Sequence, residues 1–286
     1  MTAVVSTRRY IKTAHFLLLA ILMASCTTIE IREADIFDNH ATVTPQSFEH
    51  EQVSLSERML ATDDDERIHA WFFQRDDARA TLLYMGGNGF LMVKSGLLVS
   101  TLQDLPVNFV LFDYRGYGQS SGSPTISGLK TDVDTVLEEI RLDEAFAKLP
   151  LIMHGHSMGS FLASEAALTH GADALVLESP ISNPKSWSRG VVPWFLRPFI
   201  RLSFEEQIAN EDNIANVKQW DAPLLIMNGT EDNITPMFMS EELYEAASTQ
   251  TRELLKIQGG NHNDLPGFEE YREAYLWLIE ALGSQV

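Results

Sequence analysis

The chain has 286 residues, of which 45% are hydrophobic and 9% aromatic, so it can bury the core of one large domain or two small ones and is not intrinsically disordered. Its 40 acidic residues outnumber the 21 basic ones, and the net charge of −19 would repel phosphate backbones, so we expect no nucleic-acid partner. The single cysteine excludes an internal disulfide and cannot by itself form a cysteine-based zinc site, and we expect no bound metal.

The first predicted element is a secretion signal. Arg8, Arg9 and Lys12 precede the apolar run Phe16–Ala24. This run is too short to cross a bilayer, which takes about 20 residues. A basic start, a short apolar run and small residues after it are typical of a signal peptide, which we assign to residues 1–25.

The signal ends in Met23-Ala24-Ser25-Cys26, which resembles the lipobox of bacterial lipoproteins. That resemblance implies that Cys26 receives a lipid that attaches the chain to a membrane. Because Thr27 follows the cysteine where an Asp would retain a lipoprotein in the inner membrane, it also implies an outer-membrane, periplasm-facing location in a bacterial cell envelope. The alternatives are an ordinary cleaved signal or a cytosolic protein with an apolar tail. We interpret residues 26–47 as a polar tether.

Strand and helix patterns alternate through residues 48–286. Short apolar runs bounded by Gly, Pro or Asp are typical of buried parallel strands, and amphipathic stretches separate them. This alternation predicts one α/β domain with a mostly parallel, eight-stranded sheet flanked by helices. The predicted strands are Val53–Arg58, Ile68–Gln74, Ala80–Met85, Asn108–Phe112, Leu151–His154, Ala174–Leu177, Leu224–Met227 and Leu254–Ile257, and the helices are Gly128–Arg141, Met158–His170, Phe238–Ala247 and Phe268–Leu282.

A glycine-rich loop, Gly86-Gly87-Asn88-Gly89-Phe90, follows the third of these strands. Such a cluster can be a plain turn or a phosphate cradle, but it lacks the lysine and the spacing of a Walker loop. We therefore interpret it as an oxyanion loop in which the Asn88 backbone N–H stabilises developing negative charge.

The strand Leu151–His154 leads into Gly155-His156-Ser157-Met158-Gly159, a G-x-S-x-G motif followed by a helix. This context is that of a nucleophile elbow, with Ser157 as the nucleophile and the Met158 backbone N–H as an oxyanion donor. A purely structural turn is the alternative. Although His154 and His156 flank the serine, we expect them to pack or to line the pocket floor and not to act as the base.

A serine nucleophile needs a base that is oriented by an acid. Asp232 and His262 each follow a later predicted strand, and they complete the chain order serine, acid, histidine. Both would then lie at the carboxyl edge of the sheet, where reactive groups gather in such folds. Glu178 also ends a strand and is a rival for the acid, and Glu231 is a neighbour that would point elsewhere.

These motifs together resemble the α/β-hydrolase superfamily over residues 48–286. The segment Phe112–Gly122 adds to the likeness, because many members share such a loop, in which its Asp113 and Arg115 are structural. The chain is most similar to the small-lid branch of lysophospholipase-like, monoacylglycerol-lipase-like and protein-deacylase-like hydrolases. That branch implies a cofactor-free Ser-Asp-His triad. Gly86 stands where many relatives have a histidine.

The resemblance implies a lid in the insertion 181–220, which is rich in aromatic and apolar residues. Some of these residues would pack as an ordinary core helix, but we expect others to form an acyl pocket over the site.

The whole sequence therefore predicts a serine hydrolase that cleaves carboxylic esters or thioesters of moderately hydrophobic acyl groups. Its partners would be a small-molecule or acylated substrate and, through the lipid, a membrane. Two alternatives stay open, namely an aminopeptidase-like amide hydrolase and a non-catalytic scaffold at the envelope.

Overall fold

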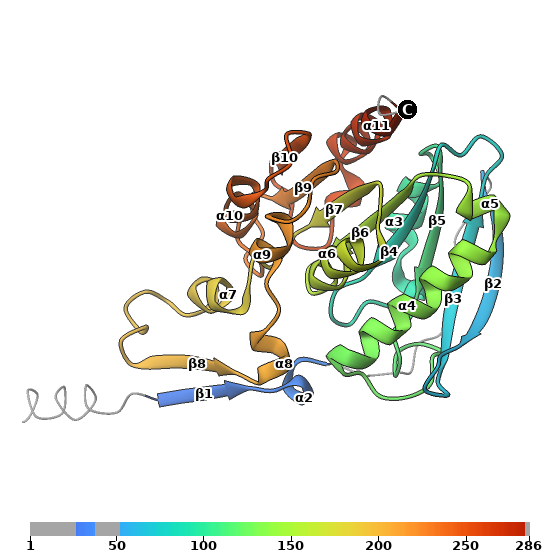
Figure 1. The fold of residues 1–286 in the computed structure, drawn as a ribbon. Helices are drawn as coiled ribbons and strands as arrows, with labels where there is room; N and C mark the ends of the chain where they lie inside the picture. The colour runs from blue at the N-terminus through green and yellow to red at the C-terminus, as the bar shows by residue number, and fades with distance from the viewer. Residues whose placement is uncertain (1–26, 38–51, 284–286) are drawn as a thin grey trace, which may run out of the picture.

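The computed structural model describes residues 27–37 and 52–283, and the main sheet within it has eight strands in the order β10-β9-β7-β6-β4-β5-β3-β2 (Figure 1). Strand β3 runs antiparallel to both its neighbours, and the other pairings are parallel. This confirms the predicted mostly parallel sheet. The strands are β2 (Ser54–Ala61), β3 (Arg67–Gln74), β4 (Ala80–Met85), β5 (Val107–Phe112), β6 (Leu151–His156), β7 (Ala174–Glu178), β9 (Leu224–Gly229) and β10 (Arg252–Ile257).

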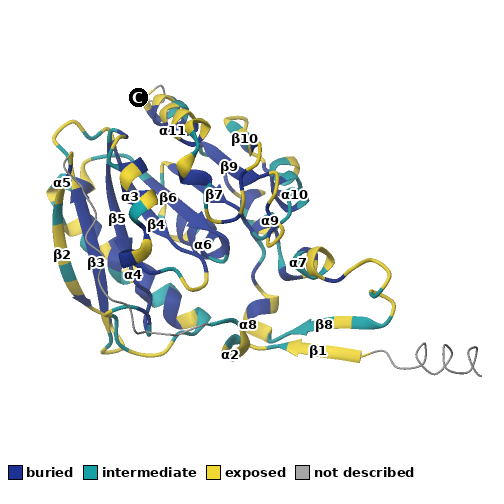
Figure 2. Ribbon diagram, turned by 180° about the vertical axis from the view of Figure 1, so that it is seen from behind, coloured by how far each residue is buried: buried dark blue, intermediate teal, exposed yellow. Residues whose placement is uncertain are grey.

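The helices cover both faces of this sheet (Figures 1 and 2). One face carries α3 (Gly96–Leu102) and α11 (Glu269–Gly283), which both contact the 3₁₀ turn η2 (Leu265–Gly267). The other face carries a connected series, α4 (Ile126–Leu142), α6 (Gly159–His170), α9 (Asn213–Val217) and α10 (Phe238–Ala246). Shorter elements are η1 (Met92–Lys94), α5 (Glu144–Ala147), α7 (Pro184–Val191) and α8 (Glu206–Ala209).

The burial of each strand follows its position in the sheet. Every residue of β4, β5 and β9 is buried, whereas the edge strand β2 is mostly exposed (Figure 2). Helix α4 buries the apolar face that its spacing predicted. Its N-cap is Thr125, whose hydroxyl accepts a hydrogen bond from the Gly128 N–H at 3.0 Å. None of the helices within the described ranges is both long and apolar enough to span a bilayer.

The register of the sheet brings the carboxyl ends of its central strands together. Met85 at the end of β4 pairs with Gly155 of β6, and Glu178 at the end of β7 pairs with Met227 of β9. Loops that follow these four strands therefore begin side by side, which is where the candidate catalytic residues were expected.

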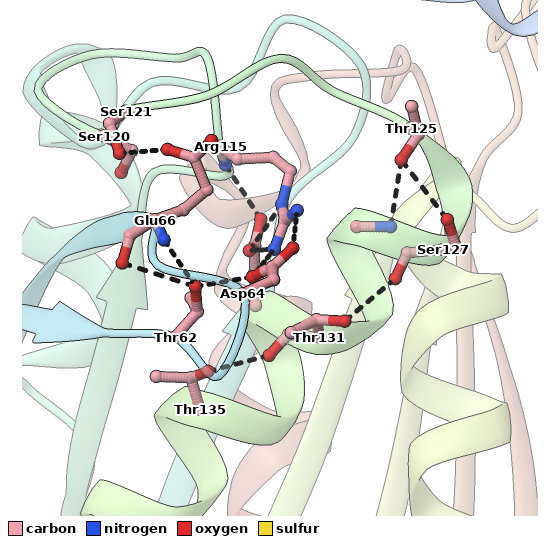
Figure 3. Close-up of polar contacts among 12 residues, drawn as sticks. Thr62, Asp64, Glu66, Arg115, Ser120, Ser121, Thr125, Ser127, Thr131 and Thr135 are labelled. Atoms are coloured by element: carbon pink, nitrogen blue, oxygen red, sulfur yellow. Dashed lines mark hydrogen bonds and ion pairs between the residues drawn. The ribbon is translucent and has the colours of Figure 1, made fainter.

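A buried arginine ties the loop after β5 to two other parts of the fold (Figure 3). The Arg115 guanidinium binds Asp132 of α4 at 2.8 Å and Asp64 of the β2–β3 turn at 2.7 Å. These contacts lower the pKa of Asp64 to about 2, with the Arg115 hydrogen bond as the largest cause. The neighbouring Asp113 accepts a hydrogen bond from the Met92 N–H at 2.8 Å. The contacts fit the structural role that the resemblance implies for Arg115 and Asp113.

Part of the segment that we interpreted as a tether has regular structure. Strand β1 (Thr27–Ile31) pairs in parallel with β8 (Ile200–Phe204), and α2 (Glu33–Ile36) follows it. In Figure 1 these two strands form an arm beside the main body. The β-branched residues of β1 favour an extended chain, and the 181–220 insertion supplies its hydrogen-bonding partner. The signal peptide, Cys26 and residues 38–47 of the tether lie outside the described residues.

Candidate active site

Ser157 occupies a tight turn between β6 and α6. Its φ of 53° is in the left-handed region, which a non-glycine residue adopts only under constraint. The flanking glycines supply the constraint, since a Cβ on Gly155 would lie 2.3 Å from the Gly159 carbonyl oxygen and one on Gly159 would lie 2.1 Å from that of Met85. The Ser157 N–H donates to the Glu178 carbonyl at 2.9 Å. The turn is thus the strained elbow that the motif predicted.

The structure brings Asp232 and His262 into direct contact. The His262 Nδ1 lies 2.8 Å from the Asp232 Oδ2. The second carboxylate oxygen accepts hydrogen bonds from the backbone N–H groups of Ile234 and Thr235 at 2.8 and 2.9 Å. Because an ionised carboxylate only accepts hydrogen bonds, this contact selects the neutral tautomer with the proton on Nδ1 and the lone pair on Nε2.

The electrostatics of this pair keep Asp232 charged. Burial raises the pKa of its carboxyl group, but hydrogen bonds from the His262 ring and from Thr235, together with the attraction of His262, outweigh burial and lower the pKa to about 2. Thr235 contributes both its N–H and its hydroxyl, which donates to Oδ2 at 2.8 Å. We did not single out Thr235 from the sequence, although its position three residues after Asp232 is a spacing typical of such side-chain capped turns.

His156 supports the loop that carries His262. Its Nε2 lies 2.8 Å from the His262 carbonyl oxygen, and the two rings are 4.9 Å apart. Burial lowers the pKa of His156, so its ring is neutral and donates the Nε2 proton to that carbonyl. His156 thus does more than the packing or pocket lining expected of it, because it also positions the histidine loop.

The rival acid Glu178 has other partners. Its Oε2 lies 2.9 Å from the His154 Nε2 and accepts a hydrogen bond from the Tyr271 hydroxyl at 3.1 Å. His154 in turn bonds to the Tyr275 hydroxyl through Nδ1. Burial raises the pKa of Glu178, but the close contact with His154, the proximity of the His156 ring and the hydrogen bond from Tyr271 outweigh burial, and the pKa is lowered. Glu178 thus belongs to a buried cluster, and its side-chain hydrogen-bond and ion-pair partners within the described ranges do not include His262.

The glycine-rich loop passes directly over the serine. A Cβ on Gly87 would lie 3.0 Å from the Ser157 Cβ, so a side chain here would crowd the elbow and glycine suits this close approach. The Asn88 side chain holds the loop in place, because its Nδ2 donates to the Ile36 carbonyl at 2.6 Å and its Oδ1 accepts from the Tyr117 hydroxyl at 3.2 Å. Met158 directly follows Ser157 at the start of α6. The two candidate oxyanion donors therefore flank the serine from different elements.

Ser157 and His262 line one cavity of about 500 Å³. Glu178 and Asn88 reach the same cavity, and Lys94 adds a cation to its wall. The apolar part of the wall comes from the segment around η1 and α3 and from the loops after β9 and β10. Its members are Phe90, Leu91, Leu97, Leu98, Ile234 and Pro266.

The expected acyl pocket is therefore built differently from the prediction. No described residue of the 181–220 insertion lines this cavity. The insertion instead forms α7, β8, α8 and α9, and part of it pairs with β1. Leu97 and Leu98 of α3, a helix that we did not predict, line the cavity instead, together with residues of the loops after β4, β9 and β10.

The chain is similar in sequence and in fold to several known proteins. Residues 76–213 match the family model described as serine aminopeptidase, S33. The uncharacterized protein Rv2307c of Mycobacterium tuberculosis is 31% identical over 209 residues, 72% of each chain, and the uncharacterized protein YfhR of Salmonella typhi is 26% identical over 276 residues, 90% of each chain. The Pyrococcus furiosus esterase Pf2001 superposes with a TM-score of 0.67 at 17% identity, covering 86% of this chain and 97% of its own.

Proposed function

We propose that this chain is a serine hydrolase of esters or thioesters. It belongs to the α/β-hydrolase superfamily, in the group that the serine aminopeptidase S33 model describes. The observation that carries the proposal is the 2.8 Å contact between Asp232 and His262 at the wall of the cavity that also holds Ser157. An activated serine needs this arrangement of acid, base and nucleophile. We also propose that the chain belongs to the small-lid branch of lysophospholipase-like, monoacylglycerol-lipase-like and protein-deacylase-like hydrolases that its motifs resemble.

In the proposed reaction the Ser157 hydroxyl attacks the acyl carbon, and its proton passes to the His262 Nε2. Asp232 holds the ring in the required tautomer and stabilises the positive charge that forms on it. The Met158 and Asn88 N–H groups stabilise the oxyanion, a contribution of about 10²–10³ in rate for each donor. His262 then protonates the leaving group, and water repeats the sequence to release the acyl group from Ser157.

The apolar wall of the cavity supports a moderately hydrophobic acyl substrate. A chain-length series of nitrophenyl esters, matched thioesters and aminoacyl anilides tests this choice. We expect kcat/KM to be highest for esters or thioesters and to rise with chain length until the cavity is filled. A preference for aminoacyl anilides would overturn the ester assignment.

Amide hydrolysis is the second candidate because the matching family model is named for an aminopeptidase and because a carboxylate, Glu178, reaches the cavity. A buried carboxylate can bind the amino group of a peptide. The engagement of Glu178 with His154 and Tyr271 makes it a weaker amine site than a free carboxylate would be. If no substrate in the series is cleaved by folded protein, the scaffold alternative holds instead.

The proposed location is the bacterial cell envelope, with Cys26 as the lipid attachment site. We expect Cys26→Ser to abolish the incorporation of labelled palmitate and the pelleting of the protein with membranes, since it is the single cysteine of the chain. Esterase activity should persist because the triad is remote from Cys26 in the chain. A wild-type protein that stays soluble in the periplasm, or that keeps Met1 in the cytoplasm, would contradict the anchor and leave the hydrolase proposal intact.

A further inference from the structure

The loop at the end of the arm, residues 192–199 between α7 and β8, exposes large aromatic side chains. We refer to it as the tip loop. Trp194 is 77% exposed and Phe195 is 55% exposed, and their rings meet edge to face with centroids 6.0 Å apart. Val191 and Ile29, next to the loop and in β1, are also exposed. An exposed group of large apolar side chains is typical of an interaction surface.

The charge of this region is opposite to that of the chain. Residues 179–204 contain no acid and four cations, Lys185, Arg189, Arg197 and Arg201, in a protein whose net charge is −19. Arg189 forms an ion pair with Glu242, which neutralises it. Lys185 and Arg201 are exposed. The tip loop therefore carries exposed aromatic rings, and the exposed cations Lys185 and Arg201 lie in the segments on either side of it. Glu30 of β1 is an exposed acid in the same arm.

The tip loop is held in shape from within. The Arg197 Nε donates to the Val192 carbonyl at 3.0 Å, and its Nη2 donates to the Arg189 carbonyl at 2.7 Å. The Phe199 N–H donates to the Leu196 carbonyl at 2.9 Å. A loop that is already ordered loses little conformational entropy when it binds a surface.

The start of the described chain lies against this loop. The Thr27 N–H donates to the Phe199 carbonyl at 2.8 Å, and Thr27 pairs with Ile200 (Figure 1). The preceding 26 residues include the apolar run Phe16–Ala24 and end at Cys26. If either the apolar run or a lipid on Cys26 enters a bilayer, the membrane must lie next to the tip loop.

We propose that the tip loop is a membrane-docking surface for a bilayer that contains anionic phospholipid. Trp and Phe side chains favour the interface between headgroups and acyl chains, and nearby Lys and Arg are attracted to anionic headgroups. The acidic body would be repelled by the same headgroups, so the tip loop is the part of the surface suited to contact them. Docking orients the arm toward the bilayer and holds the hydrolase body away from it.

Quenching of tryptophan fluorescence by brominated lipid tests the proposal on the full chain. The full-length protein is reconstituted into vesicles of phosphatidylglycerol and phosphatidylcholine whose acyl chains carry bromine. We expect a quenched component in the wild type that disappears in Trp194→Phe and persists in the control Trp277→Phe on α11. Because quenching requires contact with acyl chains, attachment of the N-terminus alone does not produce it.

Equal quenching in the wild type and in Trp194→Phe, or failure of the full chain to associate with the vesicles, would overturn the proposal. The charge of the bilayer allows a second experiment. Arg201→Gln should lower the docking equilibrium about fivefold on anionic vesicles, and the surface control Arg67→Gln should not. If Trp194 is unquenched and cross-linking shows a dimer that Trp194→Ala abolishes, the tip loop is an interface between copies of this chain and the bilayer assignment is wrong.

Discussion

Ser157→Ala should abolish covalent labelling by a fluorophosphonate and lower kcat by about 10⁶-fold, the loss typical of removing a serine nucleophile. Fluorophosphonates react with a serine that is activated by a base and flanked by oxyanion donors. Ser157 has His262 and the glycine-rich loop in the same cavity. Labelling is read by gel fluorescence and mass spectrometry, and kcat is measured with the best ester of the series.

The substitution keeps the Cβ, so alanine meets the same backbone constraint at φ 53° and the fold should be retained. A thermal melt close to that of the wild type checks this. Ser127→Ala on the surface of α4 is the matched control and should leave labelling and kcat unchanged. Continued labelling of the Ser157→Ala protein would place the reactive group elsewhere and favour the scaffold alternative.

The sequence predicts the parts of this fold that depend on local pattern. The later strands of the main sheet lie where the sequence has short apolar runs, and β2 and β3 lie on either side of the charged turn at residues 62–66. The predicted bounds of all eight strands differ from the structure by a few residues. The elbow is equally local, because Gly155 and Gly159 are needed by contacts within a few residues or with the neighbouring strand. Patterns of this kind are visible without knowledge of tertiary contacts.

The parts that escaped prediction depend on contacts between distant segments. Thr27–Ile31 looked like a polar tether because its hydrogen-bonding partner, β8, is supplied from far along the chain. The cavity wall was assigned to the aromatic insertion, whereas Leu97 and Leu98 of α3 and residues of the loops around them line it. Which apolar side chain faces a cavity is decided by packing, and composition alone does not reveal it.

Asp232→Asn should lower kcat by about 10⁴-fold if the carboxylate orients the imidazole. An amide at this position can offer its N–H₂ to the His262 Nδ1, which would favour the tautomer with the proton on Nε2 and remove the base. Asp232 is buried and has a pKa of about 2, so the wild type keeps this charge at any ordinary assay pH. The backbone donors at Ile234 and Thr235 can still bond to the amide oxygen, so the loop should hold its shape.

Glu178→Gln tests which of the two candidate acids, Asp232 or Glu178, orients the imidazole. Because Glu178 contacts His154 and Tyr271, its loss should mainly reduce stability, seen as a lower melting temperature, with a mild effect on kcat. The substitution replaces a buried carboxylate by a neutral amide but leaves the contact between Asp232 and His262 intact. The opposite result, a mild Asp232→Asn and a severe loss of kcat in stably folded Glu178→Gln, would move the orienting acid to the end of β7.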